Sequence, residues 1–129
     1  MKRIIGILAI VVFLFVICLV EELLVSSSLD KIKQDSKYLY NISIDAEKVN
    51  SEEIYNKTLE LQTFWKEKEV QLCFFINYKD MSEMSNEIVK MLSYSQSNIK
   101  EEYLASLQLL MYYCDTFNHI TGLSLQNIF

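Results

Sequence analysis

The chain has 129 residues, of which 51% are hydrophobic and 22% charged, and its formal net charge is −5. This length accommodates one ordinary domain, the composition excludes a disordered chain, and the negative charge disfavours nucleic acid as a partner. There is no proline, and Gly6 and Gly122 are the only glycines. Tight turns and hairpins usually require these two residue types, so their scarcity favours an all-α fold with short polar connections.

An uncharged apolar segment occupies residues 4–20, directly after the basic pair Lys2-Arg3. As a helix it is slightly shorter than a hydrocarbon core of about 30 Å. Leu23-Leu24-Val25 extend the apolar surface past Glu21-Glu22, whose carboxylates can reach the headgroups. We therefore predict a transmembrane signal-anchor over residues 1–25, which contacts the lipid bilayer through residues 4–25.

The flanking charges predict the orientation of this anchor. Positive residues precede it and glutamates follow it, which favours a cytoplasmic N-terminus and an extracytoplasmic domain over residues 26–129. A cleaved signal peptide is the main alternative, but its apolar region is usually about 7–15 residues long, shorter than this one. Val25-Ser26-Ser27 is also a poor cleavage site. We expect a single-pass protein of the cell membrane.

The residues after the anchor continue with a helical pattern. Apolar or small residues recur three and four positions apart, which predicts one helix face: Val25, Leu29, Ile32, Ser36, Leu39, Ser43, Ala46 and Val49. Ser26-Ser27-Ser28 could interrupt this helix at the membrane surface, or the helix could run on unbroken. The sequence leaves both possibilities open.

A second helix is predicted to begin at Asn50-Ser51-Glu52-Glu53, where Asn50 is the expected N-cap and Glu53 reaches back to it. Its apolar stripe comprises Ile54, Leu61, Trp65, Leu72 and Ile76. The stretch 70–78 resembles a buried strand locally. We assign it to the helix because it ends a longer helical period and no turn signal precedes it.

Two further capping patterns predict a third and a fourth helix. Asp80-Met81-Ser82-Glu83 opens a helix with Met81, Met84, Ile88, Met91 and Leu92 on one face, and Asn98-Ile99-Lys100-Glu101 opens a helix with Tyr103, Leu107, Leu110, Cys114 and Phe117 on its inner stripe. Gly122 is placed as the C-terminal cap of the last helix. Short connections favour antiparallel neighbours, so the prediction is an up-down bundle of three to four helices after the transmembrane helix.

No residue set in the sequence predicts catalysis, a cofactor or a metal. His119 is the only histidine, and Asp115 and Cys114 nearby do not complete a ligand cluster. Adjacent carboxylates such as Glu52-Glu53 point about 100° apart on a helix and cannot act jointly on a substrate. Cys73 and Cys114 could lie at similar heights if their helices run parallel, so a disulfide remains an open alternative to two free thiols.

Aromatic pairs suggest interaction surfaces, because two adjacent aromatics on a helix cannot both face the same core. Trp65, Phe74 and Tyr112 are the candidates, beside their alternative as core residues. The tail 123–129 follows the predicted cap at Gly122 and is uncharged and apolar. We expect it to fold back on the bundle near Trp65 or Phe75, or else to bind a partner through Leu125, Ile128 and Phe129.

Three stretches carry a resemblance to a known family: Trp65-Lys66-Glu67-Lys68, Phe75-Ile76 and the closing Leu123-Ser124-Leu125-Gln126-Asn127-Ile128-Phe129. The sequence resembles the DUF4363 family, small bacterial proteins of unknown function with one N-terminal membrane helix. The family has no assigned catalytic residues. The resemblance implies a bacterial cell envelope and association with another membrane protein.

These observations lead to a function hypothesis without an enzymatic activity. We expect a membrane-anchored envelope protein whose helical domain mediates protein–protein interaction, within a membrane complex. The alternative is an extracytoplasmic ligand-binding or sensory bundle. An exposed aromatic patch would favour the first function, and a closed apolar pocket with converging polar groups would favour the second.

Overall fold

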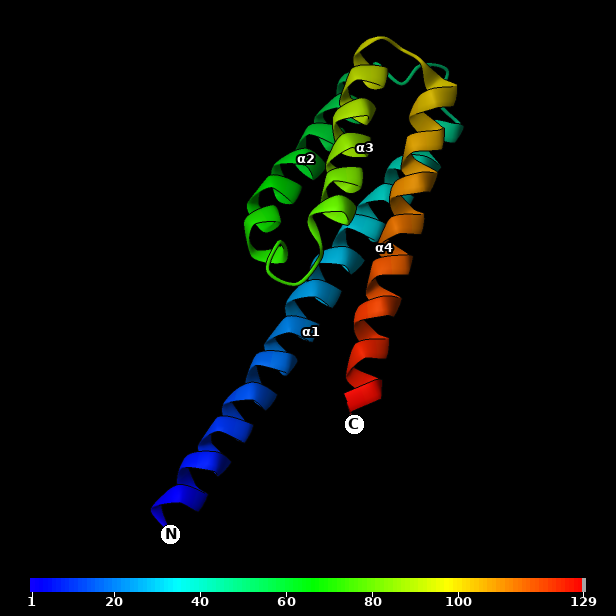
Figure 1. Cartoon of the computed structure of the whole chain (residues 1–129). Coiled ribbons are helices and arrows are strands. Elements are labelled where there is room, and N and C mark those ends of the chain that lie inside the picture. Colours follow the sequence, from blue (N-terminus) through cyan, green and yellow to red (C-terminus); the bar gives the residue numbers. More distant parts are fainter. Residues whose placement is uncertain (129) are drawn as a thin grey trace.

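The computed structural model describes the backbone of residues 1–128 and the side chains of residues 1–117. Within the described backbone there are four helices and no strand: α1 (Lys2–Ile44), α2 (Glu52–Leu72), α3 (Tyr78–Gln96) and α4 (Lys100–Ile128). The helices form an antiparallel up-and-down bundle from which α1 projects (Figure 1). Helices α1 and α3 each contact α2 and α4. The prediction of a long apolar first helix followed by a helical bundle is confirmed.

Helix α1 runs without a break from the apolar segment into the bundle. Ser26-Ser27-Ser28 are helical, so the triple serine does not interrupt it. Bundle packing begins at Val25 and continues through Leu29, Ile32 and Leu39, all at most 1% exposed. The predicted face is therefore the packed face, although the helix ends at Ile44 rather than near Val49.

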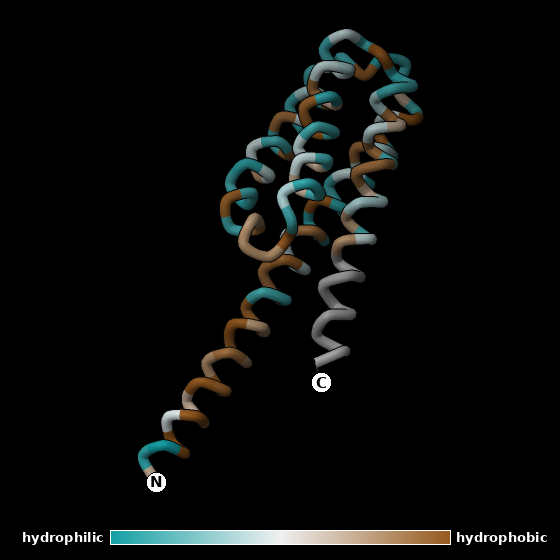
Figure 2. The backbone as a smooth tube through the Cα atoms, in the orientation of Figure 1, coloured by the Kyte–Doolittle hydropathy of each residue, from teal (hydrophilic) through white to brown (hydrophobic). Residues whose placement is uncertain are grey.

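The N-terminal half of α1 extends away from the other helices as a continuous hydrophobic rod (Figure 2). Its large apolar side chains, in the stretch 4–20, are 41–69% exposed. Among the residues that the structure describes, α1 is the one helix long and apolar enough to cross a membrane.

The core contains the apolar stripes that the sequence predicts for α2, α3 and α4. Trp65, Tyr103, Met84, Met91 and Leu107 are among its largest fully buried or nearly fully buried side chains. The Tyr103 hydroxyl lies 2.7 Å from Thr58 Oγ1, and Thr58 Oγ1 donates to the carbonyl of Ile54. Burial raises the pKa of Tyr103, while its bond to Thr58 opposes this shift. The methionines predicted on one face of α3 are core residues, which leaves them unavailable as an adaptable binding surface.

The helix starts differ from the predicted caps. Ser51, not Asn50, caps α2 by accepting from the Ile54 N–H, and Asn77 caps α3 by accepting from the Asp80 N–H. The prediction placed the start of this helix at Asp80 because Glu83 follows three residues later, as in a capping box. The position of each cap depends on where the preceding connection ends and the helix begins. The local sequence pattern does not specify that position.

Asn98 also serves a tertiary contact rather than the predicted cap of α4. Its φ of 54° places it in the left-handed region, which asparagine tolerates, and its Oδ1 accepts from the Val49 N–H at 2.9 Å. Ser95 Oγ donates to the Val49 carbonyl at 2.6 Å, and Lys100 Nζ donates to the carbonyls of Ile44 and Ala46. These bonds join the α1–α2 connection to the α3–α4 connection and close one end of the bundle.

Two predicted helix ends are wrong. Helix α2 stops at Leu72, and residues 73–76 form a turn instead of continuing the helix to Tyr78. The chain turns here because α3 runs back against α2, and Leu72 and Ile76 on either side of the turn are both buried. Helix α4 continues through Gly122 to Ile128, so Gly122 is not a C-terminal cap. A single glycine costs a helix only about 1 kcal/mol, too little to end it by itself.

Candidate functional site

Trp65 is part of the bundle interior. Its indole is 2% exposed, and Nε1 donates a 2.8 Å hydrogen bond to Ser85 Oγ, which in turn donates to Glu69. Trp65 therefore links α2 to α3 with both its apolar body and its polar edge. In this packing it presents no surface to a partner.

The most exposed apolar side chains of the bundle lie in the α2–α3 connection and at the adjoining helix ends. Val70, Phe74 and Tyr78 are 68%, 79% and 85% exposed, and we refer to these three residues as the aromatic turn. Local structure explains their orientation: Leu72 and Ile76 turn inward, while backbone bonds from Phe75 and Ile76 to the Leu72 carbonyl tighten the chain between them. Phe74 is thus directed outward, as expected for one member of an adjacent aromatic pair.

The aromatic turn lies at the end of the bundle from which the apolar part of α1 emerges (Figure 1). The opposite end holds the two connections joined by Asn98 and Lys100. Side chains of the last two turns of α2 also line a cleft with Val20 and Leu23 of α1. The position in the fold therefore places the exposed aromatics next to the predicted membrane surface.

Tyr112 is a second exposed aromatic, located on α4. Its side chain is 62% exposed, whereas its neighbour Tyr113 is partly buried and stacks on Phe117 with ring centroids 5.7 Å apart. This pair again divides into one inward and one outward ring. The side chains of the other three candidates, Leu125, Ile128 and Phe129, lie outside the described residues, as does any contact of the tail with Trp65 or Phe75. The backbone is nevertheless helical to Ile128, which removes the turn at Gly122 on which the fold-back prediction was based.

A cleft of about 590 Å³ separates α1 from α2 where α1 leaves the bundle. We call it the α1–α2 cleft; its walls combine apolar residues, serines and two lysines: Val20, Leu23, Leu24, Ser27, Ser28, Lys31, Phe64 and Lys68. The Lys31 and Lys68 ammonium groups lie 5.0 and 5.8 Å from the centroid of the Phe64 ring. The sequence patterns did not single out this site, because its two lysines are far apart in the chain.

The cysteines are free thiols in two different environments. Cys73 is exposed directly after the end of α2, where its Sγ donates to the Val70 carbonyl. Cys114 is buried in α4, and desolvation raises its pKa to about 12. The alternative of a disulfide between them is not realised in this structure.

The acidic residue considered beside His119 is engaged elsewhere. Asp115 accepts a hydrogen bond from Lys33 Nζ, and this contact raises the pKa of Lys33. Within the part of the chain whose side chains are described, no group of three or more His, Cys, Asp or Glu residues could hold a metal ion. The side chain of His119 lies outside that part.

Comparison with protein-family models assigns the chain to a family. The model described as "Domain of unknown function (DUF4363)" matches residues 22–128. The chain belongs to the DUF4363 family. The match begins just before the first buried residue of α1 and covers the whole bundle. No curated protein and no solved structure matches the chain.

Proposed function

We propose that this DUF4363 protein is a membrane-anchored docking module without enzymatic activity, which binds another membrane protein through the aromatic turn. Residues 4–25 would span the bilayer, with the N-terminus in the cytoplasm and the bundle outside, in a bacterial cell envelope. The observation that carries the proposal is the exposure of Val70, Phe74 and Tyr78 at the bundle end beside the apolar half of α1.

The apolar half of α1 supports the anchor. Its side chains have no polar face, and each exposed apolar square ångström costs about 25 cal/mol in water. A lipid environment removes this cost, and the helix satisfies its own backbone hydrogen bonds there. The cleavable-signal alternative would remove Val20 to Val25, and with them a buried core residue of the bundle.

The aromatic turn supports a protein partner. Aromatic side chains concentrate the binding energy of many protein interfaces, and a contiguous exposed apolar patch on a small domain often marks a binding site. Its proposed position beside the membrane favours a partner that is itself held at that membrane. This constraint is the reason for proposing a membrane complex rather than a soluble ligand.

The ligand-binding alternative has weaker support. The interior of the bundle is filled by Trp65, Tyr103 and a set of leucine and methionine side chains that are almost fully buried. A small molecule between the helices would have to displace this core. The α1–α2 cleft lies outside this core, where α1 leaves the bundle.

Site-specific photocrosslinking in cells tests the proposal. A photoreactive phenylalanine analogue at position 74 of the full chain should give a discrete adduct with a second membrane protein. The same analogue at position 112, equally an exposed aromatic site but on α4, is the matched control and should not. The substitution Tyr78→Ser should weaken the adduct at position 74 without lowering the melting temperature, because Tyr78 is 85% exposed. Adducts with lipid alone, or equal adducts at positions 74 and 112, would contradict the proposal.

A further inference from the structure

We propose that the α1–α2 cleft binds one anionic phospholipid, with the headgroup phosphate at Lys31 and Lys68 and the acyl chains along Val20, Leu23 and Leu24. This inference rests on the proposed membrane span, because it places the apolar end of the cleft in the bilayer. It adds a specific lipid site to a domain whose overall charge is negative.

The cleft has a cationic end and an apolar end. Lys31 and Lys68 come from two different helices and converge over the same Phe64 ring. Leu23 and Val20 lie more than one turn of α1 closer to the N-terminus than Lys31. They also line the cleft, and their side chains are 70% and 53% exposed. The polarity therefore changes along the cleft in the direction in which α1 enters the apolar segment, and a phospholipid has the same order of headgroup and acyl chain.

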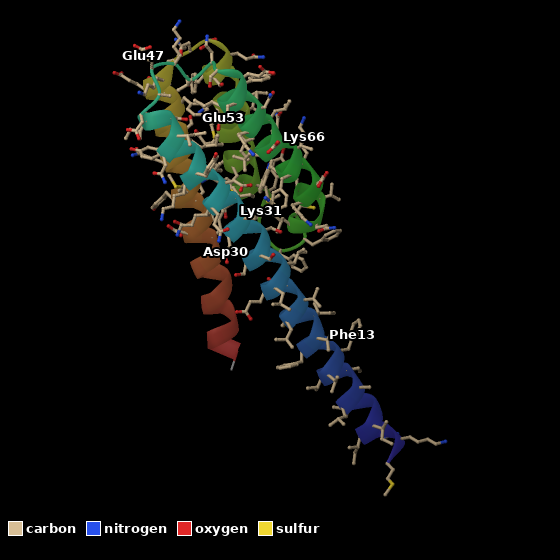
Figure 3. The ribbon with its side chains drawn as sticks, turned by 180° about the vertical axis from the view of Figure 1, so that it is seen from behind. Phe13, Asp30, Lys31, Glu47, Glu53 and Lys66 are labelled. Carbon is tan, nitrogen blue, oxygen red and sulfur yellow. The ribbon has the colours of Figure 1, made fainter. Side chains whose placement is uncertain are left out.

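The location of the lysines agrees with a headgroup position. Figure 3 shows Lys31 near the base of the bundle and Phe13 further along the projecting part of α1. Basic side chains at the end of an apolar segment are typical contacts of lipid phosphates. Ser27 adds a hydroxyl to the cleft wall between Lys31 and Leu23, within the part of the lining where a headgroup would lie.

The lysines have charge available for a ligand. Lys68 has no ion-pair partner among the residues whose side chains are described, and none of the described carboxylates lines the cleft. Lys31 pairs with Asp35 at 3.0 Å, but both side chains are largely solvated, and such exposed pairs are weak. Glu60 and Glu67 line an adjoining groove together with Lys31. These carboxylates weaken the binding of any anion at Lys31, so contacts of the acyl chains with the apolar end of the cleft must contribute to the affinity.

A lipid explains the whole lining, whereas a soluble anion explains only half. Inorganic phosphate could bind the two ammonium groups but would leave Val20, Leu23 and Leu24 exposed. A second apolar helix could cover these residues but would leave the two lysines desolvated without a counter-charge, which is costly. The combination of charge and apolar surface is therefore best matched by an anionic phospholipid.

Lipid retention by the full-length protein tests the inference. The protein is reconstituted into nanodiscs containing equal amounts of phosphatidylglycerol and phosphatidylcholine, extracted in mild detergent, and its bound lipids are quantified by native mass spectrometry. The wild type should retain a single phosphatidylglycerol in preference to phosphatidylcholine. The double substitution Lys31→Gln/Lys68→Gln should lower this preference about tenfold, since each lysine near an anionic lipid contributes substantially to binding.

Matched variants separate the site from general charge effects. Lys66→Gln removes an exposed lysine of α2, the helix that also carries Lys68. Lys66 lies outside the cleft lining, so this variant should leave the preference for phosphatidylglycerol unchanged. Lys31→Arg/Lys68→Arg keeps both charges and should retain it. Competition by inorganic phosphate should be weak; displacement of the lipid by phosphate at millimolar concentration would show a soluble-anion site and overturn the inference.

The remaining outcomes distinguish the lipid site from the proposed function. Loss of the double-lysine variant from the membrane fraction would show that the lysines act in anchoring rather than in a lipid site. A wild-type protein in the membrane fraction with no lipid preference would overturn the inference and leave the proposed anchor intact. A wild-type protein absent from that fraction would overturn the anchor itself.

Discussion

The two halves of α1 form one continuous helix but have opposite relations to their surroundings. In residues 4–20 the large apolar side chains cover the whole circumference and are all substantially exposed. In residues 25–44 only one face is apolar and buried, while Asp30, Lys31 and Gln34 occupy the outer face. The backbone hydrogen bonds are the same in both halves, so the distribution of side chains alone decides whether a segment suits lipid or a packed bundle.

This contrast also shows why the junction is the informative part of the molecule. Val25 is fully buried, whereas Leu23, two residues earlier, is 70% exposed. The aromatic turn and the α1–α2 cleft both lie at this level of the fold. A helix whose surroundings change within one turn brings buried bundle residues and exposed apolar residues into the same small region.

The largest expected effect comes from removing the main core side chain of the bundle. Trp65→Ala should destabilise the bundle by about 3–5 kcal/mol, because it creates a cavity and leaves Ser85 Oγ without the indole N–H donor. Denaturant unfolding of the full chain in mild detergent, followed by circular dichroism, measures the change. A loss below about 1 kcal/mol would contradict the buried position of Trp65.

A charge in the projecting half of α1 should affect insertion and leave the bundle unchanged. Val12→Lys places a charge near the middle of the apolar segment, which costs about 2.5–3.5 kcal/mol of apparent insertion free energy. A reporter that is active only outside the cytoplasm, fused after Phe129, should be active in the wild type and lose activity in this variant.

The matched control lies on another helix of the bundle. Val89→Lys adds the same charge at an exposed position of α3 and should leave the reporter active. A cytoplasmic reporter that is active in the wild type would reverse the proposed orientation. Equal activity in the wild type and Val12→Lys would remove the evidence for a span.

The smallest expected effect concerns the two thiols of the bundle. In a Cys18→Ser background, Cys73 should react with a thiol reagent at pH 8, whereas Cys114 should remain unmodified until the protein unfolds. Burial raises the Cys114 pKa from 9.0 to about 12, so its thiol stays protonated in the folded state. The unfolded state ionises first, so this group lowers stability as the pH rises from about 9 towards 12. Mass spectrometry of labelled peptides measures the order in which the two cysteines react. Equal labelling rates for Cys73 and Cys114 would contradict the prediction.

The sequence predicted the parts of the fold that depend on periodic patterns. The apolar stripes of α2 and α4, from Ile54 to Leu72 and from Tyr103 to Phe117, are buried as predicted. The outward orientation of one ring in the Tyr112–Tyr113 pair of α4 also followed from helix geometry alone. Such features repeat every three or four residues, so several positions support each of them.

Helix ends and the candidate site could not be predicted in the same way. The cap at Asn77, the end of α2 at Leu72 and the continuation of α4 past Gly122 each depend on one or two residues whose local preferences are worth about 1 kcal/mol. Packing against other helices outweighs preferences of that size. Asn98 illustrates this, because its hydrogen bond to Val49 joins two connections that are far apart in the chain.

The sequence by itself determined that this protein has an apolar N-terminal segment and helices with one buried face, because these properties follow from which side chains recur along the chain. Only the tertiary structure decided that α1 is continuous, that Phe74 and Tyr78 lie beside its emerging end, and that Lys31 and Lys68 meet over Phe64. The physical reason is that these juxtapositions join separate helices, and their geometry is set by how the buried faces pack together.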